Sequence, residues 1–321
     1  MNILVLGAGT FGTAIAHQLA RNNNNNVYLF SRNKSKVDEI NTSHTNISCF
    51  PNKKIGLKLK ATNNKKDIEK SDIVFIALPS SVIIENLLLI KNLFKKNVLF
   101  VNLSKGLLAG GITVVDNIKE SLQTENVVTL KGPSFAVELL DNSDTLLTLG
   151  YTTNRQCEII NSVIKHTSLH IDTTKDIRGV EILSVLKNIY ALILGVIDAQ
   201  YDSANTRFMI LTKSFSEIRV LLELLGGKQE TLFLACGFGD LGLTSLNDLS
   251  RNRTLGLLIG KGFFNADYKS NAVVLEGLNS IRMFYEIAGN KNIKELPLFN
   301  KLYNFLIHKE RKLEFKFDDL N

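Results

Sequence analysis

A single charged side chain interrupts the most apolar stretch of the chain, ILSVLKNIYALILG at positions 182–195. It is Lys187, and in a helix its face would hold mainly small or apolar neighbours: Leu183, Ser184, Tyr190 and Ala191. An ammonium on such a surface costs free energy unless it reaches water or meets a partner. Lys187 is therefore either a lysine that snorkels over a core or a proton donor and acceptor placed for catalysis.

Two polar clusters downstream could work with such a lysine. The segment ACGFGDLGLTS (235–245) contains one acid, Asp240, which could orient an ammonium and hold its charge. The segment LSRNRTLG (249–256) supplies hydroxyl, guanidinium and amide donors that suit a phosphate: Ser250, Arg251 and Asn252. The alternative for this second cluster is a helix that begins at an N-cap serine and exposes its arginines. A third segment, NAVVLEGLN (271–279), places the carboxylate of Glu276 in an apolar setting.

A glycine-rich motif near the start of the sequence indicates a dinucleotide site. Gly7, Gly9 and Gly12 form a GxGxxG pattern directly after the apolar run ILVL and at the start of a helical segment. The first glycine allows a tight turn, the second lets the backbone approach a pyrophosphate, and the third allows close helix–strand packing. The helix would direct its first N–H groups at the phosphates. The alternative is a glycine-rich turn that binds no ligand.

The residues that follow the second apolar run, VYLFSRN (27–33), bear on the choice of cofactor. A site selective for NAD usually places Asp or Glu here to bind the ribose 2′-hydroxyl. This chain has Ser31 and Arg32, and an arginine can pair with the 2′-phosphate of NADP. We therefore expect a site for NADP or NAD, with NADP(H) preferred. The alternative is that Arg32 is only an exposed residue at a strand end.

Two further segments, FVNLSKGL (100–107) and LKGPSFAVE (130–138), place small and polar residues after predicted strands. In a doubly wound sheet, ligands bind beyond the carboxyl ends of the strands. Lys105 could contact an anionic substrate or the cofactor, although a lone loop lysine is more often solvated. Gly132, Pro133 and Ser134 would bring backbone and hydroxyl donors close to the nicotinamide or the substrate.

The elements that must hold these groups alternate in the first half of the chain. Short apolar runs predict strands at 3–6, 27–30, 73–77, 98–102, 127–130, 145–149 and 169–172. Segments between them predict helices at 13–21, 34–41, 82–93, 114–122, 135–140 and 155–165. Such alternation is typical of an α/β fold with a doubly wound, largely parallel sheet.

After about residue 175, the sequence pattern predicts helices alone, at 183–199, 210–225, 229–235, 253–261, 271–288 and 297–308. A chain of 321 residues is also longer than one core usually supports. We therefore expect a dinucleotide-binding domain over 1–178 and an all-helical substrate-binding and catalytic domain over 179–321.

Composition limits the class of protein and its surroundings. The chain is 45% hydrophobic and 21% charged, with a net charge of +7 and a pI of about 9.1. Its basic residues are scattered rather than gathered in a stripe with aromatics, so nucleic acid is not an expected partner. The three cysteines form no CxxC pair and the N-terminal run has no basic region of a signal peptide, so a reducing cytoplasm is expected.

Membrane insertion and metal binding are not expected either. The apolar run 183–197 is shorter than the roughly 20 residues of a membrane span and contains Lys187 and Asn188. The five histidines share no ligand spacing, and no GxSxG, HExxH or Walker motif occurs.

Taken together, these segments resemble bacterial NAD(P)-dependent glycerol-3-phosphate dehydrogenases over essentially the whole chain. The resemblance rests on an ordered set of motifs: the N-terminal GxGxxG, SKGL, GPSFAVE, LKNIYAL, GFGDLGLT, SRNRTLG and VVLEG. It implies a Rossmann-type domain joined to an all-helical domain, often in a homodimer. It also implies interconversion of dihydroxyacetone phosphate and sn-glycerol 3-phosphate by hydride transfer, a reaction that supplies glycerophospholipid biosynthesis.

The resemblance also implies roles for individual residues. Lys187 falls at the family's catalytic lysine, the proton acceptor in alcohol oxidation, and Asp240 would orient it. Besides the three glycines, the implied cofactor contacts are Thr10, Phe11, Arg32, Lys105, Ala136, Arg251, Val274 and Glu276. The implied substrate contacts are Lys105, Gly132, Ser134, Lys187, Asp240, Ser250, Arg251 and Asn252.

Two segments depart from the family pattern. Lys213 and Ser214 stand where an Arg-Gly pair is expected, and the segment 195–207 has fewer glycines than usual. These departures concern the local loop shape more than the reaction. Two other functions remain open on the sequence alone: a related two-domain reductase of a ketoacid or hydroxyacyl thioester, and a non-catalytic NAD(P)-sensing protein. The lysine–aspartate pair and the phosphate-type donors favour the dehydrogenase.

Overall fold

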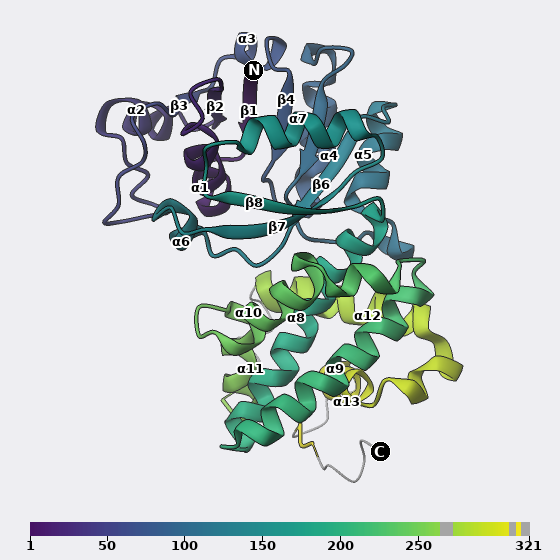
Figure 1. Cartoon of the computed structure of the whole chain (residues 1–321). Coiled ribbons are helices and arrows are strands. Elements are labelled where there is room, and N and C mark those ends of the chain that lie inside the picture. Colours follow the sequence, from purple (N-terminus) through teal and green to yellow (C-terminus); the bar gives the residue numbers. More distant parts are fainter. Residues whose placement is uncertain (264–271, 308–312, 316–321) are drawn as a thin grey trace. The chain divides into compact units, whose positions relative to one another are not determined.

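The computed structural model of this chain describes residues 1–263, 272–307 and 313–315, and at 272–278 and 290–291 it describes the backbone alone. The chain forms two compact units (Figure 1). The first holds Met1–Lys105 and Val114–Ile177, and the second holds Gly106–Thr113 and Arg178–Asn321. The short segment 106–113 was expected in the first domain. It belongs to the helical unit because Leu107 packs against the helical core and Arg178 donates a hydrogen bond to the carbonyl of Gly111.

The first unit is built on one eight-stranded sheet. Its strands are β1 (Asn2–Leu6), β2 (Asn26–Phe30), β3 (Lys60–Thr62), β4 (Ile73–Ile76), β5 (Leu99–Asn102), β6 (Val127–Lys131), β7 (Thr145–Gly150) and β8 (Leu169–Thr174). They lie in the order β3-β2-β1-β4-β5-β6-β7-β8, and every pair is parallel except β6 with β7. The expected doubly wound, largely parallel sheet is confirmed. The chain order reverses between β1 and β4, the switch point where ligands bind in such sheets.

Strand side chains point alternately to the two faces of the sheet. Both faces are therefore apolar here, and helices cover both of them. On β1, Ile3 and Val5 enter one core cluster, while Leu4 and Leu6 enter another. The first cluster includes side chains of α1 (Thr10–Leu19), α2 (Lys34–Ser43), α6 (Ala136–Leu140) and α7 (Asn154–Ile164). The second includes side chains of α3 (Lys65–Glu69), α4 (Ile83–Leu89) and α5 (Val114–Leu122). Burial on both faces explains why the central strands read as continuous apolar runs.

The sequence-based prediction is wrong for short elements of this unit. It missed β3 and α3, because β3 has three residues, begins at an exposed lysine and lies at the edge of the sheet. The helix predicted at 82–93 is instead a 3-10 turn at Ser80–Val82, then α4, then a second 3-10 turn at Lys91–Leu93. The remaining strands and helices of the unit lie within three residues of their predicted bounds.

The asparagine run at 22–26 forms the turn between α1 and β2, but two of its side chains are structural. Asn22 is 1% exposed, and its side-chain amide donates to the carbonyls of Ser162 and Val163. The amide of Asn25 also donates to the carbonyl of Val163. The last carbonyls of a helix have no donor within the helix. These asparagines therefore tie the turn to the end of α7.

One buried histidine links three segments of the first unit. The Nδ1 of His17 in α1 accepts the backbone N–H of Gly56 at 2.9 Å. The ring therefore carries its proton on Nε2, which lies 3.2 Å from the Oδ1 of Asn142. Burial lowers the pKa of His17 from its usual value near 6.5. This histidine is neutral and structural.

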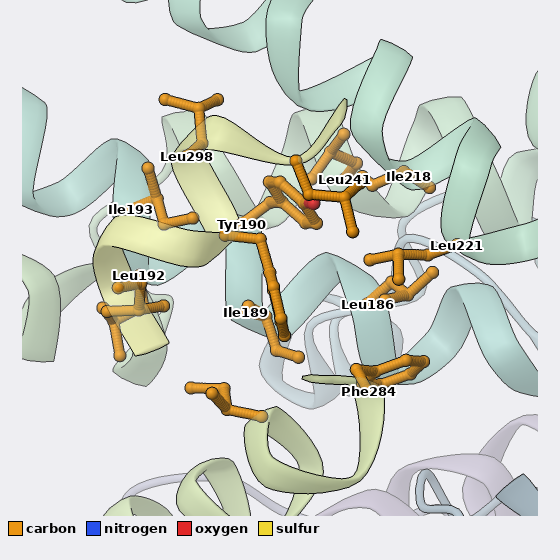
Figure 2. Packing of buried hydrophobic residues seen from close by; sticks show 14 of the residues in the cluster. Leu186, Ile189, Tyr190, Leu192, Ile193, Ile218, Leu221, Leu241, Phe284 and Leu298 are labelled. Carbon is orange, nitrogen blue, oxygen red and sulfur yellow. The ribbon is translucent and has the colours of Figure 1, made fainter. Parts of the chain in front are cut away.

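The second unit consists of helices packed around one long, buried helix, α8 (Ile177–Gln200). Its other α-helices are α9 (Ala204–Leu224), α10 (Asp240–Leu246), α11 (Arg251–Gly260), α12 (Ala272–Asn292) and α13 (Pro297–Ile307). Figure 2 shows the ring of Tyr190 from α8 in the centre of this core, with Leu186, Ile189, Phe284 and Leu298 around it. The expected helical C-terminal domain is confirmed.

The length and hydropathy of α8 are those of a helix that could cross a membrane, with a mean hydropathy of 1.9 over its most apolar stretch. However, 94% of that stretch is buried inside the fold, as expected for a core helix. The helix begins at Ile177, well before the predicted start at 183, and α9 begins at Ala204 rather than 210. The first turn of α9 contains Asn205, Thr206 and Arg207, so it lacks the apolar pattern that marks a helix.

A buried carboxylate on α9 holds the start of α13. Glu217 is 3% exposed, and its oxygens accept the backbone N–H groups of Leu298 and Phe299 at 2.7 and 3.0 Å. One oxygen also accepts the hydroxyl of Tyr190 at 2.9 Å. Burial raises the pKa of Glu217 to about 7, although these hydrogen bonds and the nearby Lys213 act to lower it. Glu217 thus caps a helix whose first N–H groups would otherwise be unpaired.

The variant Glu217→Gln is expected to change how the free energy of unfolding depends on pH. The pKa of Glu217 is about 7 in the fold and near 4.5 when unfolded, so the fold binds this proton more tightly. The stabilisation from this tighter proton binding is complete below pH 4.5. As the pH rises through 7, the free energy of unfolding loses this contribution of about 3 kcal/mol. Chemical denaturation of both proteins measures this: the stability of wild type minus that of the variant should fall over this range. A difference independent of pH would contradict the assignment.

Candidate functional site

Lys187 lies in the middle of α8 and is 8% exposed. Its ammonium donates to the Oδ1 of Asp240 at 2.6 Å and to the Oγ1 of Thr244 at 2.8 Å. The charge therefore meets a buried carboxylate rather than bulk water. A buried ion pair of this kind is weak support for stability, because its desolvation offsets its attraction. Such a pair inside an apolar core points instead to a chemical role.

Asp240 and Thr244 reach the lysine because of an unusual helix start. A π-helix at Ala235–Gly239 continues directly into α10, whose first residue is Asp240. Thr244 follows four residues later, so both side chains leave the same face of α10. Asp240 is 1% exposed and Thr244 is 6% exposed, and the threonine hydroxyl lies 3.3 Å from the aspartate Oδ1. Asp240 was predicted from the sequence and Thr244 was not, although its spacing in DLGLT could have indicated it.

The first turn of α11 carries the candidate phosphate donors. Ser250 is its N-cap, and the hydroxyl oxygen accepts the backbone N–H of Arg253 at 3.3 Å. Arg251 is exposed and Asn252 is half-buried, and neither side chain bonds to another described residue. The serine hydroxyl can still donate its own proton. The N-cap expected under the alternative reading is present, and it leaves the arginine and the asparagine able to meet an anion.

In the first unit, the glycine-rich turn joins β1 to α1. Gly7 has a φ of 111°, and a Cβ on Gly12 would lie 2.0 Å from the carbonyl oxygen of Gly7. Gly9 begins the helix without a side-chain cap, and nothing lies within 4 Å of where its Cβ would be. The N–H of Thr13 is the first to bond within the helix, so earlier N–H groups have no acceptor there. This turn fits the pyrophosphate of a dinucleotide.

The other predicted cofactor positions near this turn are on the surface of the unit. Thr10 is exposed and Phe11 half-buried at the start of α1. Arg32 follows β2 and is exposed, with Asn33 next to it as the N-cap of α2. The position after β2 therefore holds a cation and no carboxylate, which suits a 2′-phosphate.

A buried lysine that sequence-based reasoning missed supports the ends of β5 and β6. Lys131 is 2% exposed, and its ammonium donates to the carbonyls of Asn102 and Ser104 at 3.1 and 2.6 Å. It thereby ties the last residue of β6 to the segment that leads into the half-buried Lys105. A lysine directly before Gly132 in LKGPS was the available signal.

The remaining predicted residues fall on β6–α6 and on α12. Gly132 is buried, Ser134 is half-buried and donates to the carbonyl of Gly132 at 3.1 Å, and Ala136 is the first residue of α6. Val274 and Glu276 belong to α12, and their side chains lie outside the described residues.

Comparisons with known proteins match the chain almost from end to end. The family model described as NAD-dependent glycerol-3-phosphate dehydrogenase N-terminus matches residues 2–157, and the corresponding C-terminus model matches residues 176–315. A glycerol-3-phosphate dehydrogenase (NAD(P)+) of Clostridium acetobutylicum is 33% identical over 307 residues, which are 95% of this chain and 92% of the relative. The chain belongs to the NAD-dependent glycerol-3-phosphate dehydrogenase family.

Other relatives of this dehydrogenase family agree. A glycerol-3-phosphate dehydrogenase (NAD(P)+) of Methanothermobacter thermautotrophicus is 33% identical over 94% of this chain and 92% of its own length. The crystal structure of glycerol-3-phosphate dehydrogenase from Coxiella burnetii is 29% identical, with a TM-score of 0.85 over 96% of this chain and 95% of that one. The resemblance read from the motifs is confirmed, as is NAD or NADP as the cofactor of the family.

In this member of the dehydrogenase family, the expected site residues divide between the two units. The first unit carries Gly7, Gly9, Thr10, Phe11, Gly12, Arg32, Lys105, Gly132, Ser134 and Ala136. The second carries Lys187, Asp240, Ser250, Arg251, Asn252, Val274 and Glu276. Within the second unit, the structure brings Lys187 and Asp240, which are 53 residues apart in sequence, into direct contact.

Proposed function

We propose that this chain is a glycerol-3-phosphate dehydrogenase, which reduces dihydroxyacetone phosphate to sn-glycerol 3-phosphate with NAD(P)H and also catalyses the reverse reaction. Membership of the family supports the reaction. The observation that carries the proposal is the buried ammonium of Lys187, held by a carboxylate and a hydroxyl. A protein that only sensed a dinucleotide would not need a proton donor held in this way.

Lys187 is the proposed acid and base. Reduction of the ketone adds a hydride to C2 and a proton to the C2 oxygen, and the ammonium of Lys187 would donate that proton. In the reverse direction the neutral amine would accept it. Asp240 would balance the charge. Thr244 would keep the nitrogen in place, since its hydroxyl lies 2.8 Å from the lysine nitrogen and 3.3 Å from the aspartate Oδ1.

The first unit is the proposed holder of NADP or NAD. The glycine-rich turn and the first N–H groups of α1 would bind the pyrophosphate, with Thr10 and Phe11 beside it. Arg32 would pair with the 2′-phosphate, so NADP(H) is the preferred cofactor. When bound, the reduced nicotinamide supplies the hydride that C2 receives. The other proposed cofactor contacts are Lys105, Ala136, Arg251, Val274 and Glu276.

The substrate phosphate is the proposed ligand of the first turn of α11. The hydroxyl of Ser250, the guanidinium of Arg251 and the amide of Asn252 offer several charge-assisted donors to one anion. Binding at the phosphate, away from the reacting carbon, supplies free energy that orients C2 for reaction. The further proposed substrate contacts are Lys105, Gly132 and Ser134.

We also propose a cytoplasmic enzyme that supplies glycerophospholipid biosynthesis. All three cysteines are free thiols in the fold, which suits a reducing compartment. A homodimer is the assembly that the family resemblance implies.

Steady-state consumption of NADPH or NADH tests the proposed function. The chain should oxidise NADPH with dihydroxyacetone phosphate, and the KM for NADPH should be lower than the KM for NADH. Ketopantoate and acetoacetyl-CoA serve as competing candidate substrates. Turnover of either of these in place of dihydroxyacetone phosphate would indicate a related reductase, and binding of NADPH without any turnover would indicate a sensor.

A further inference from the structure

A buried carboxylate on α8 is shared by two arginines from other helices. The Asp198 side chain is 3% exposed, and its Oδ1 accepts a hydrogen bond from the Nε of Arg207 in α9. Its Oδ2 accepts one from a terminal nitrogen of Arg253 in α11 at 2.8 Å. The other terminal nitrogen of Arg253 binds Asp248, whose side chain is 90% exposed. Asp198 therefore links three helices of the second unit: α8, α9 and α11.

Two of these helices, α8 and α11, are also in close backbone contact. A Cβ on Gly256 would lie 2.1 Å from the carbonyl oxygen of Leu192, and one on Gly195 would lie 2.2 Å from the carbonyl oxygen of Arg253. Only glycine permits backbones to approach this closely. These glycine contacts set the distance between the two helices, but they do not fix the rotation of one helix relative to the other. The Asp198–Arg253 ion pair supplies the directional contact that fixes how the start of α11 is turned.

Arg253 is the point at which this anchor reaches the candidate phosphate site. Its backbone N–H is bound by the N-cap Ser250, while its side chain is bound by Asp198. Arg251 and Asn252 lie between Ser250 and Arg253 in the same helical turn. Asp198 also follows Lys187 by eleven residues on α8, which is about three turns and places the two side chains on one side of the helix.

We propose that Asp198 is a positioning residue for the substrate phosphate: through Arg253 it fixes the first turn of α11 that presents Ser250, Arg251 and Asn252. This inference rests on the proposed function. In this role Asp198 would act through Arg253 and would contact neither substrate nor cofactor itself. One helix, α8, then carries both the proton donor and the anchor of the phosphate donors.

The variant Asp198→Asn tests this role. It should raise the KM for dihydroxyacetone phosphate about tenfold with kcat nearly unchanged, because it weakens ground-state and transition-state binding of the phosphate alike. Inorganic phosphate, used as a competitive inhibitor, should show a similar rise in its inhibition constant. The matched control is Asp248→Asn, which removes the exposed partner of the same arginine and should leave KM unchanged, since exposed ion pairs contribute little.

A variant that removes both partners of the Asp198–Arg253 pair guards against a folding defect. Arg207, the other partner of Asp198, has a side chain that is 31% exposed and can be solvated. In Asp198→Asn combined with Arg253→Met, the ion pair is replaced by neutral side chains, and the same rise in KM and in the phosphate inhibition constant is expected. An unchanged KM in both variants, or a fall in kcat without any change in phosphate inhibition, would overturn the inference. If wild type itself does not turn over dihydroxyacetone phosphate, the proposed function fails instead.

Discussion

Replacing Lys187 with arginine is expected to lower kcat by about 10³-fold, while the affinity for NADPH stays unchanged. Arginine preserves the positive charge beside Asp240, so the buried carboxylate keeps a partner and the fold is retained. A guanidinium does not give up its proton near neutral pH, so it cannot serve as acid and base in turn. The glycine-rich turn that would bind the dinucleotide belongs to the other unit.

The variant Lys187→Ala provides an independent readout of the same role. It removes the amine entirely, and small alkylamines added to the assay should restore part of the turnover if proton transfer is what was lost. Rescue should follow the amine's basicity. The control variant is Lys261→Ala, since Lys261 is an exposed lysine at the end of α11 in the same unit. Near-normal turnover of Lys187→Arg would remove this lysine from the mechanism.

The second large effect is expected at Gly9. A Cβ at this position meets nothing within 4 Å, and its backbone is extended, so Gly9→Ala should leave the thermal unfolding temperature almost unchanged. The same Cβ would stand where a pyrophosphate must approach the backbone. The Kd for NADPH is therefore expected to rise by about tenfold or more, from the loss of roughly 1.4 kcal/mol or more of binding free energy.

Gly12 supplies the contrast, because its role is packing within the fold. A Cβ there would lie 2.0 Å from the carbonyl oxygen of Gly7 and 3.0 Å from the Cβ of Ala77. Gly12→Ala is expected to destabilise the first unit by about 3 kcal/mol, because the helix must move away from the turn. Calorimetry and NADPH titration of both variants separate the two roles. Tight NADPH binding by a stable Gly9→Ala protein would show that this turn does not hold the pyrophosphate.

The order of strands and helices was largely predictable because both depend on local patterns. Buried parallel strands are continuous apolar runs, and the Gly7–Gly12 motif marks a turn with its own conformational demands. The elements that were missed lack such a pattern: β3 has three residues, and α10 contains the weak helix former Gly242. The segment 106–113 was assigned to the first domain. It belongs to the helical unit because Leu107 packs against the helical core, a contact that no local pattern shows.

The candidate site was predictable to a smaller extent. Lys187 and Asp240 were identified from their apolar surroundings and from the family motifs, but Thr244 and Lys131 were not. Helical periodicity shows that Lys187 lies on an apolar face. A catalytic lysine and a snorkelling lysine would both lie on such a face, so periodicity does not distinguish them. The direction of the side chain and its partner, 53 residues away, follow only from how α10 packs against α8.

The sequence alone determined the α/β sheet, the helical second half, the glycine-rich turn and the family, since each is set by residues close together along the chain. The tertiary structure decided the partners of the buried charges: Lys187 with Asp240, Asp198 with Arg253 and Glu217 with the start of α13. A charge is stable inside a core only where distant segments bring a counter-charge or donor to it. That condition depends on packing between helices, which no local pattern records.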